Sequence, residues 1–409
     1  MRHAKLILRW SILVGIFLWV NVRWQSGPPV QADSSHSQAT GDSFVYLPIV
    51  FTPGYTYLPI ISTGPALPNW PGGKWMGPDG VSAVAIDDDP QNADIFYTAT
   101  VGAGIFKSSD SGRTWTWAST GLGNLTLDSF AVDPIDSNTL YAGTHGDGVY
   151  RSNDGGQYWF PVNNGIPSGT VVYTLAVNPG NHNILYAGTR DQGIFRDGVE
   201  HYQGKLFKST DGGASWYNTL STSDDWAYSI AADADHPSTV LAAIHAAGPY
   251  ISNDYGETWR LAVIGQGDWS KGRAVAFDPR TSQQRAYYAG WHGDFYVSSD
   301  NGSSWIESNS GLGSSHIFPN GIAIQPDNPE ILYLADFTQG PAGVMKSTDA
   351  GISWSPAGLS SKNVYSVATS TKALLAGTYL DGIYRSTDGG GSRARRDGGG
   401  RCRRHGRRS

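Results

Sequence analysis

The chain has 409 residues, of which 39% are hydrophobic, 12% aromatic and 16% charged, a composition that fits one large all-β domain or two small ones. The formal net charge is −6, yet residues 33–392 hold 17 lysines and arginines against 34 acidic residues. So acidic a body argues against nucleic acid as a partner, and the single cysteine, Cys402, excludes an internal disulfide framework.

The first 32 residues have the pattern of a secretory signal peptide. Three basic residues precede an apolar run over residues 10–22, and residues 30–32 read Val-Gln-Ala, a small-residue cleavage site. The alternative is a membrane anchor, but the run is short for a spanning helix and Arg23 ends it. We therefore expect no membrane span after signal removal, and a protein that is secreted or held in the cell envelope, in the periplasm or at the cell surface.

A polar, proline-rich linker is expected over residues 33–72. The phrase Tyr-Leu-Pro-Ile occurs twice in it, at residues 46–49 and 57–60, amid threonine, proline and glycine. Proline excludes a helix there and allows at most extended structure of the edge type. A spacer is the favoured interpretation, and a small docking element is the alternative.

One short phrase returns seven times along the rest of the chain. Its form is Ser-x-Asp-x-Gly-x-x-Trp, and successive aspartates are 44, 57, 43, 46, 49 and 39 residues apart. A period of about 40–50 residues with strand-like flanks is typical of a radial repeat. The repeated residues, without a tryptophan in the seventh copy, are Asp110, Asp154, Asp211, Asp254, Asp300, Asp349 and Asp388, and Trp115, Trp159, Trp216, Trp259, Trp305 and Trp354.

Each copy belongs to a longer unit that predicts a four-stranded antiparallel meander. In one unit the runs 130–134, 140–144 and 148–152 are separated by turn residues, and a fourth run begins at Trp159. The phrase falls in the turn between the third and fourth runs, where its glycine can adopt positive φ and its aspartate can accept hydrogen bonds from turn amides. We interpret these residues as scaffold, because seven equivalent aspartates cannot converge on one substrate.

On these residues the chain resembles the Asp-box (BNR) repeat family of β-propellers, over about residues 74–392. The resemblance implies the fold and leaves function open, because such propellers occur in sialidases, xyloglucan-cleaving glucanases, sortilin-type receptors and photosystem II assembly factors. Sialidases of this kind carry an Arg-Ile-Pro signature, which is absent here. The xyloglucan-cleaving enzymes place their cleft between two propellers, whereas we expect one. The assembly factors are single seven-bladed rings, but they carry arginine-rich patches, unlike this acidic body.

We expect an all-β, seven-bladed propeller of four-stranded antiparallel blades over residues 73–392, closed into a ring by an N-terminal strand. Residues 73–78 look like a fourth strand without a blade, and the seventh phrase stops before its own fourth strand. Pairing of the two near Tyr384 would leave no blade edge open.

Residues 393–409 form an Arg/Gly-rich tail with eight arginines and one acidic residue. A basic tail for anionic partners is one interpretation. A frameshift or truncated reading frame is the favoured one, because the tail begins where the seventh phrase should reach its tryptophan.

In a four-stranded meander the loops between second and third strands, and those linking the blades, share one face around the central axis. These loops vary between copies and combine acidic groups with aromatic rings, which suits sugar recognition. Candidate ligand-binding residues are Trp226, Tyr228, Trp269, Arg273, Trp291, His292, Asp294, His145 and Tyr379. Local turn formation is the alternative for the His-Gly-Asp loops. Four loop histidines could meet to bind a metal, but they lack close ligand spacing, so we expect no metal and no cofactor.

The favoured hypothesis is an exported binding or assembly module, expected to be monomeric, that engages a glycan or an envelope protein through its variable loop face. The alternative is a glycoside hydrolase, sialidase-like or glucanase-like, that uses paired loop carboxylates as acid and base. Its candidate catalytic residues are Asp224, Asp225 and Asp268. The sequence alone does not decide whether the protein is an enzyme.

Overall fold

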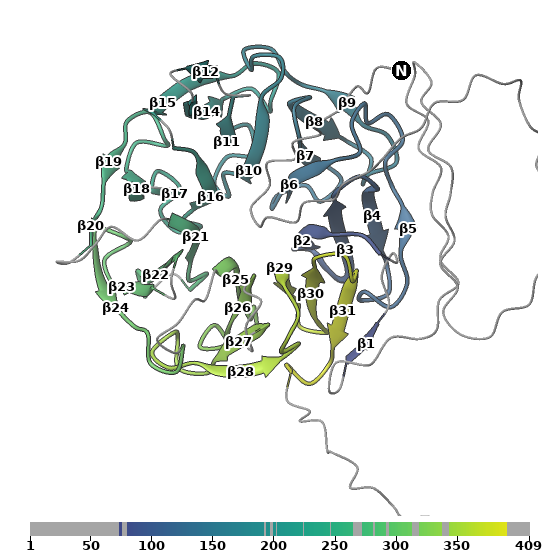
Figure 1. The fold of residues 1–409 in the computed structure, drawn as a ribbon, viewed down its shortest axis with the longest axis vertical. Helices are drawn as coiled ribbons and strands as arrows, with labels where there is room; N and C mark the ends of the chain where they lie inside the picture. The colour runs from purple at the N-terminus through teal and green to yellow at the C-terminus, as the bar shows by residue number, and fades with distance from the viewer. Residues whose placement is uncertain are drawn as a thin grey trace, which may run out of the picture. The chain divides into compact units, whose positions relative to one another are not determined.

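The computed structural model describes residues 73–75, 80–191, 194–196, 199–201, 203–223, 225–245, 247–264, 272–280, 283–291, 294–312, 319–337 and 343–390. These residues form seven blades around one axis, each built on four antiparallel strands (Figure 1). This part of the chain contains no helix that could cross a membrane. The predicted all-β, seven-bladed propeller is confirmed, whereas the predicted signal peptide, linker and C-terminal tail lie outside the described residues.

The blades follow the chain in order, and each begins at its innermost strand. Blade 1 consists of β2 (Ala83–Asp89), β3 (Asn92–Thr100), β4 (Gly104–Ser108) and β5 (Thr116–Trp117). Blade 2 consists of β6 (Leu127–Val132), β7 (Leu140–Thr144), β8 (Val149–Ser152) and β9 (Phe160–Pro161). Blade 3 consists of β10 (Val171–Val177), β11 (Leu185–Arg190), β14 (Gln203–Ser209) and β15 (Tyr217–Ser223). Blade 4 consists of β16 (Ala227–Ala232), β17 (Val240–Ile244), β18 (Gly248–Ser252) and β19 (Arg260–Leu261).

The remaining blades include two additions to the simple repeat. Blade 5 consists of β21 (Gly272–Phe277), β22 (Ala286–Gly290), β23 (Phe295–Ser298) and β24 (Ser304–Glu307), with β20 (Val263–Ile264) added in parallel beside β24. Blade 6 consists of β25 (Pro319–Ile324), β26 (Leu332–Asp336), β27 (Val344–Ser347) and β28 (Ser355–Gly358). Blade 7 consists of β29 (Val364–Thr369), β30 (Leu374–Thr378), β31 (Ile383–Ser386) and β1 (Gly73–Trp75). A separate hairpin, β12 (Ile194–Arg196) and β13 (Val199–His201), is inserted in blade 3.

The seventh blade takes its outer strand from the N-terminal side of the chain. Strand β1 pairs antiparallel with β31, with Gly73 opposite Ser386 and Trp75 opposite Tyr384. Blades 7 and 1 are also joined directly, because Arg385 Nε donates a hydrogen bond to the Ser111 carbonyl at 2.6 Å. That β1 stabilises the whole ring stays a prediction.

Each Asp box is a hydrogen-bonded turn. In the first copy Asp110 Oδ1 accepts from the Thr114 N–H at 2.8 Å and from the Ser108 hydroxyl at 2.9 Å, and Oδ2 accepts from the Thr114 hydroxyl at 2.7 Å. Gly112, whose φ is 80°, donates its N–H to the Ser108 hydroxyl at 2.9 Å. The serine–aspartate and glycine–serine bonds recur in all seven copies. The aspartates therefore serve the turn.

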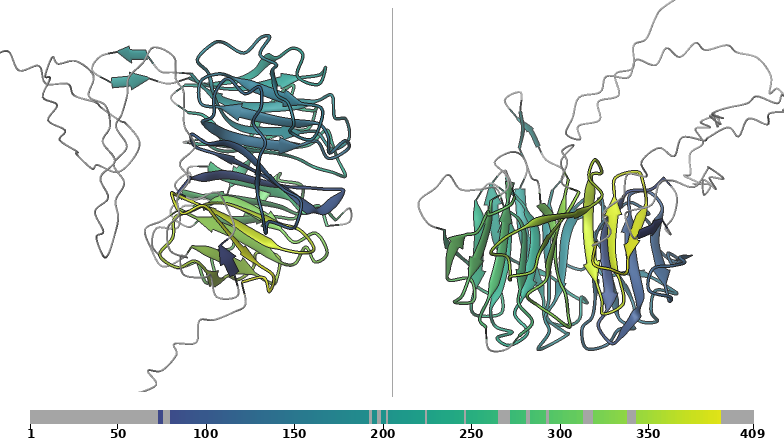
Figure 2. Two further views of the ribbon diagram at one scale, coloured as in Figure 1. Left: turned by 90° about the vertical axis from the view of Figure 1, so that its right-hand side faces the viewer. Right: turned by 90° about the horizontal axis from the view of Figure 1, so that it is seen from below.

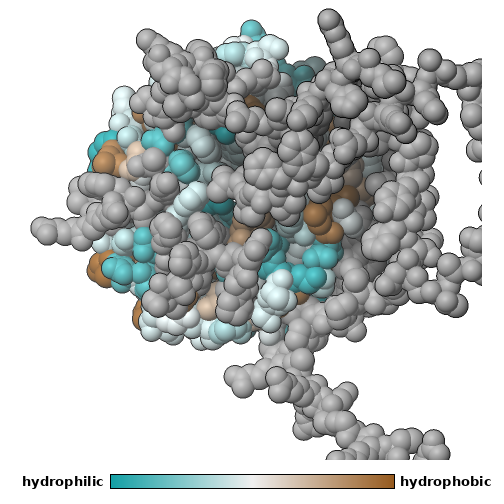
Figure 3. Space-filling view, in the orientation of Figure 1, coloured by the Kyte–Doolittle hydropathy of each residue, from teal (hydrophilic) through white to brown (hydrophobic). Residues whose placement is uncertain are grey.

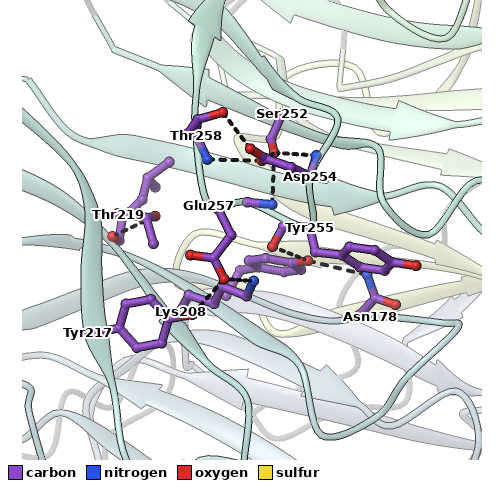
Figure 4. Close-up of polar contacts among 12 residues, drawn as sticks. Asn178, Lys208, Tyr217, Thr219, Ser252, Asp254, Tyr255, Glu257 and Thr258 are labelled. Carbon is purple, nitrogen blue, oxygen red and sulfur yellow. Dashed lines mark hydrogen bonds and ion pairs between the residues drawn. The ribbon is translucent and has the colours of Figure 1, made fainter.

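The boxes also fasten neighbouring blades together, as the seam between blades 3 and 4 illustrates (Figure 4). The Tyr186 hydroxyl of blade 3 donates to the Tyr255 carbonyl in the box of blade 4 at 3.1 Å, and Lys208 pairs with Glu257 at 2.6 Å. A Cβ on Gly256 would lie 2.7 Å from the Tyr186 ring, so this position requires glycine. Seven clusters of buried hydrophobic residues fill the seven seams, one to each.

The Asp boxes and the variable loops lie on opposite faces, because turns after the third strand and turns after the second strand leave a meander at opposite ends. The β12–β13 hairpin stands on the face that is toward the viewer in Figure 1, as the side views show (Figure 2). Among the residues coloured in Figure 3, hydrophobic ones form small separate areas between hydrophilic ones on this face. The seams bury the hydrophobic surface, which leaves this face free to vary.

Candidate functional site

The first strand of every blade carries a β-bulge at the same place. In blade 3 the pairing register shifts between Val172 and Thr174, so Tyr173 is the extra residue. In each blade the residue before the bulge is buried and the bulged residue is partly exposed, although both belong to the innermost strand. We call the bulged residues the inner ring; they are Val84, Asp128, Tyr173, Tyr228, Arg273, Asn320 and Tyr365.

A second ring of equivalent positions lies where the second strands end. In each blade a buried residue precedes the bulge and pairs with a residue of the second strand; the ring position is the next residue along the chain. In blade 3, for example, Val172 pairs with Thr189, and the ring position is Arg190. We call it the loop ring; its members are Val101, His145, Arg190, His245, Trp291, Phe337 and Tyr379. Contacts within single blades join the two rings: His145 Nδ1 lies 2.8 Å from Asp128 Oδ2, and the Arg273 guanidinium lies 5.4 Å from the Trp291 ring centroid. We call the two rings, with Trp226, the axial site.

Blades 3 to 5 contribute a continuous stack of aromatic and cationic groups. The Arg190 guanidinium lies 5.0 Å from the Trp226 ring, which stacks on His245 with centroids 4.5 Å apart and planes 5° apart. His245 meets Trp291 edge to face at 5.4 Å. Tyr173 contacts both Arg190 and Trp226, at 5.4 and 6.1 Å. Sequence reasoning placed Trp226 and Trp291 in different loops, and the structure brings them to one surface.

Arg273 is the cation of the inner ring. Its guanidinium lies 4.1 Å from the Tyr228 ring centroid and donates to the Asn320 side-chain oxygen. Burial lowers the pKa of Arg273, while the hydroxyls of Tyr228, Tyr365 and Tyr173 act in the opposite direction. These tyrosines come from blades 4, 7 and 3, as expected for inner-ring residues that face a common axis.

The other blades present different chemistry to the axis. Blade 2 places Asp128 beside His145, and this hydrogen bond raises the pKa of His145. Blades 6 and 7 form an aromatic group in which Phe337 stacks on Tyr365 at 4.4 Å and Tyr379 meets both rings edge to face, at 6.1 and 5.9 Å. Burial raises the pKa of Tyr365 to about 12, so its hydroxyl stays protonated at neutral pH.

Of the three candidate catalytic residues, the structure describes only Asp225. Asp225 lies directly before Trp226, with Oδ1 3.5 Å from His245 Nδ1. Asp224 and Asp268 lie outside the described residues, as do the candidate ligand-binding residues Trp269 and His292. The Asp294 carbonyl accepts from the Gly290 N–H at 2.8 Å, which closes the loop between β22 and β23.

No group of three or more histidine, cysteine or acidic side chains suited to a metal ion occurs among the described residues. On the same face, a shallow pocket of about 240 Å³ lies over blade 3 and is lined in part by Thr170, Asp191 and Lys205. It lies beside the axial site rather than in it, since none of the ring residues lines it.

Sequence reasoning missed Asp128, Tyr173, Asn320 and Tyr365. Each lies within what looks like an ordinary strand, and only the bulge turns it toward the axis. A signal does exist, because every inner-ring residue lies five positions before the residue that opens the turn after the first strand, as Asp128 does before Asp133. Alignment of the seven units on that turn would have found the ring.

Comparisons with known proteins agree with this architecture. Residues 103–249 match the family described as Sortilin-Vps10 (sortilin, neurotensin receptor 3). Over 163 residues the chain is 28% identical to a xyloglucanase from Hypocrea jecorina (strain QM6a). The aligned part is 39% of this chain and 18% of that protein. The chain is an Asp-box (BNR-type) β-propeller.

Solved structures similar to this Asp-box propeller are of two kinds. The GH74 xyloglucanase from Xanthomonas campestris has a TM-score of 0.60 at 18% identity, over 76% of this chain and 52% of that one. An ancestral GH74 enzyme has a TM-score of 0.61 at 20% identity, over 78% and 46% of the two chains. YCF48 bound to D1 peptide has a TM-score of 0.55 at 16% identity, over 79% and 99%. The propeller thus spans about half the length of the GH74 enzymes, and at these identities the likeness shows the fold alone.

Proposed function

We propose that this protein is an exported binding propeller that holds a glycan at the axial site. The observation that carries the proposal is the stack in blades 3 to 5, where Tyr173, Trp226, Tyr228 and Trp291 surround two guanidinium groups. Aromatic faces suit the C–H faces of sugar rings, and guanidinium N–H groups suit their oxygens. All of these side chains are partly exposed.

The variability of the rings supports binding over a scaffold role. At one backbone position, set by the same bulge, seven blades carry valine, aspartate, tyrosine, tyrosine, arginine, asparagine and tyrosine. A position that served only the fold would be filled alike in each blade, as the Asp boxes are. Residues that vary on a fixed framework are the usual means of recognising a ligand.

Glycoside hydrolysis remains the second candidate, favoured by the 28% identity to a xyloglucanase. Hydrolysis needs two carboxyl groups about 5–5.5 Å apart for retention or about 6.5–9.5 Å apart for inversion. The described carboxylates of the axial region, Asp128 and Asp225, each lie beside a histidine. This arrangement favours positioning of the imidazoles.

The experiment incubates the purified protein with a panel of neutral and acidic polysaccharides and sialosides, and measures co-sedimentation and new reducing ends on the same samples. We expect binding without cleavage. Trp226→Ala should weaken it at least about tenfold, equivalent to about 1.4 kcal/mol. The matched control is Trp117→Ala on the outer strand of blade 1, where a tryptophan that is 55% exposed contacts no axial residue. New reducing ends that disappear with Asp268→Asn would favour the hydrolase, and silence in both assays would direct the search to an envelope protein.

A further inference from the structure

Arg273 is placed unlike the other arginines whose bonds are described in the propeller. Arg280, in the turn after β21, is neutralised by Asp278 at 2.5 Å and Glu330 at 2.8 Å. Arg151 and Arg385 donate to backbone carbonyls of the next Asp box, at 2.8 and 2.6 Å. These arginines have structural partners that account for their presence.

The bonding of Arg273 is incomplete by comparison. No carboxylate forms an ion pair with it among the described residues, and its hydrogen-bond partners, Asn320 and Tyr228, are neutral side chains. Its Nε is buried and has no hydrogen-bond partner there. The side chain as a whole is partly exposed at the axis. A buried, uncompensated charge is costly, so such a group is retained where something else supplies the opposite charge.

Resting on the proposed function, we infer that Arg273 binds a carboxylate of the ligand, so that the glycan carries an acidic sugar. The Arg273 guanidinium lies over the rings of Tyr228 and Trp291, at 4.1 and 5.4 Å from their centroids, so a sugar ring that packs beside these side chains has its carboxylate within reach of the guanidinium. The planar fork of an arginine matches a carboxylate in geometry as well as in charge.

The charge of the rest of the molecule narrows the class of acidic glycan that can bind. With 34 acidic residues against 17 basic ones over residues 33–392, the body repels a polyanion. A chain of continuous uronic acids is therefore a poor ligand. The structure suits an otherwise neutral glycan in which an isolated residue, such as a glucuronic acid branch, carries the carboxylate.

The test uses matched ligands that differ in one group. Oligosaccharides of xylan, glucan and galactan type that carry a single uronic acid are compared with the same oligosaccharides after reduction of the carboxyl to an alcohol, and affinity for the full-length protein is measured by titration calorimetry. We expect the protein to prefer one acidic form over its reduced form by about tenfold or more, as charge-assisted hydrogen bonds of this kind give. Added salt should weaken binding of the acidic form and leave the reduced form unchanged.

Variants assign the preference to one residue. Arg273→Gln should bring the ratio of the two affinities close to one, and Arg273→Lys should keep part of it. Arg260→Gln, at an exposed arginine on the outer strand of blade 4, should leave the ratio unchanged. Because the readout is a ratio within one variant, partial unfolding of Arg273→Gln does not disturb it.

The outcomes separate this inference from the proposed function. Equal affinity for acidic and reduced forms, or a preference that survives Arg273→Gln, overturns the carboxylate assignment and leaves glycan binding standing. Absence of binding to every oligosaccharide overturns both. If instead a peptide with a free C-terminal carboxylate binds, its amide does not, and no oligosaccharide does, the ligand is a protein and the glycan class is wrong.

Discussion

The propeller contains two sets of seven equivalent positions that have opposite character. In the Asp boxes the same serine, aspartate and glycine recur with the same hydrogen bonds, whereas the inner ring carries five kinds of residue on one repeated bulge. The boxes act between neighbouring blades, and the inner ring acts around the common axis. Repetition of sequence thus marks the groups that hold the ring together, and variation within an identical backbone frame marks the groups that we propose to meet a ligand.

Two tryptophans give the sharpest test of this division. Trp159 follows an Asp box, is 0% exposed and donates its Nε1 hydrogen to the Ala118 carbonyl of the preceding blade at 2.8 Å. Trp159→Ala should therefore cost about 3–5 kcal/mol of unfolding free energy and lower the melting temperature by roughly 10 °C. Trp226→Ala removes a partly exposed ring of the axial site and should change the melting temperature much less, while affinity for the ligand falls.

Thermal unfolding and ligand binding measured on both variants check this contrast. If Trp226→Ala destabilised the protein as much as Trp159→Ala, the axial stack would belong to the scaffold. If Trp159→Ala abolished binding in a fully folded protein, the boxes would take part in recognition. Either result would contradict the division between structural Asp boxes and a ligand-binding inner ring.

Removal of residues 70–80 tests a single seam of the ring. Strand β1 covers the edge of β31, and without it the backbone groups of that strand are left open to solvent. We expect the melting temperature of the whole propeller to fall by several degrees, since blades 7 and 1 also share a hydrophobic cluster and the Arg385 bond that remain. Deletion of residues 33–43 is the control of equal length. An unchanged melting temperature in the 70–80 deletion would show that the seam closes without β1.

The contrast between the Asp boxes and the inner ring also explains how much of the fold and of the site could be predicted from the sequence. The boxes depend on local rules, in which an aspartate accepts from amides three and four residues later and a glycine adopts positive φ, so seven copies fixed the blade number and strand order. The axial site depends on a bulge that turns Tyr173 or Asn320 to the axis, and a single strand does not reveal it; the signal is visible only when the seven units are aligned on the turn that follows the first strand. Trp226 and Trp291 could be found as aromatic residues in variable loops, but their common stack with Arg190 arises only when three blades are brought together.

Acid should destabilise the folded protein through the aspartates of the Asp boxes. Burial alone would raise the pKa of Asp254, but hydrogen bonds from the Thr258 side chain and amide and from Ser252 outweigh it and lower the pKa to about 2. The pKa values of Asp110, Asp154, Asp211, Asp300 and Asp349 are lowered as well. A depressed pKa gives stability that is present above the unfolded value near 4 and is lost as pH falls toward 2.

Asp254→Asn should therefore lower the unfolding free energy at pH 7 by about 1–2 kcal/mol, because bonds to an ionised acceptor are lost. The same variant should lose less stability than the wild type between pH 4 and pH 2. Denaturant titrations at these pH values give both quantities. A wild-type stability that is flat below pH 4 would mean that the box carboxylates contribute no net free energy.

A predicted effect of the opposite sign comes from one blade that breaks the repeat. Three residues after each bulge, six blades carry alanine, whereas blade 1 carries Asp87, which accepts from the Val132 N–H of blade 2 at 3.0 Å. Burial, with repulsion from Asp88, raises the pKa of Asp87 to about 7. The folded protein thus holds a proton that the unfolded chain releases, so stability should fall as pH rises from about 4 to about 7, by no more than about 1.4 kcal/mol per pH unit. Asp87→Asn keeps an acceptor for the Val132 N–H and removes the charge, so it should flatten this slope and raise the melting temperature at pH 8. If the variant kept the wild-type slope, the proton would have to reside on the neighbouring Asp88, whose pKa burial raises to about 6, and Asp88→Asn should then remove the slope instead.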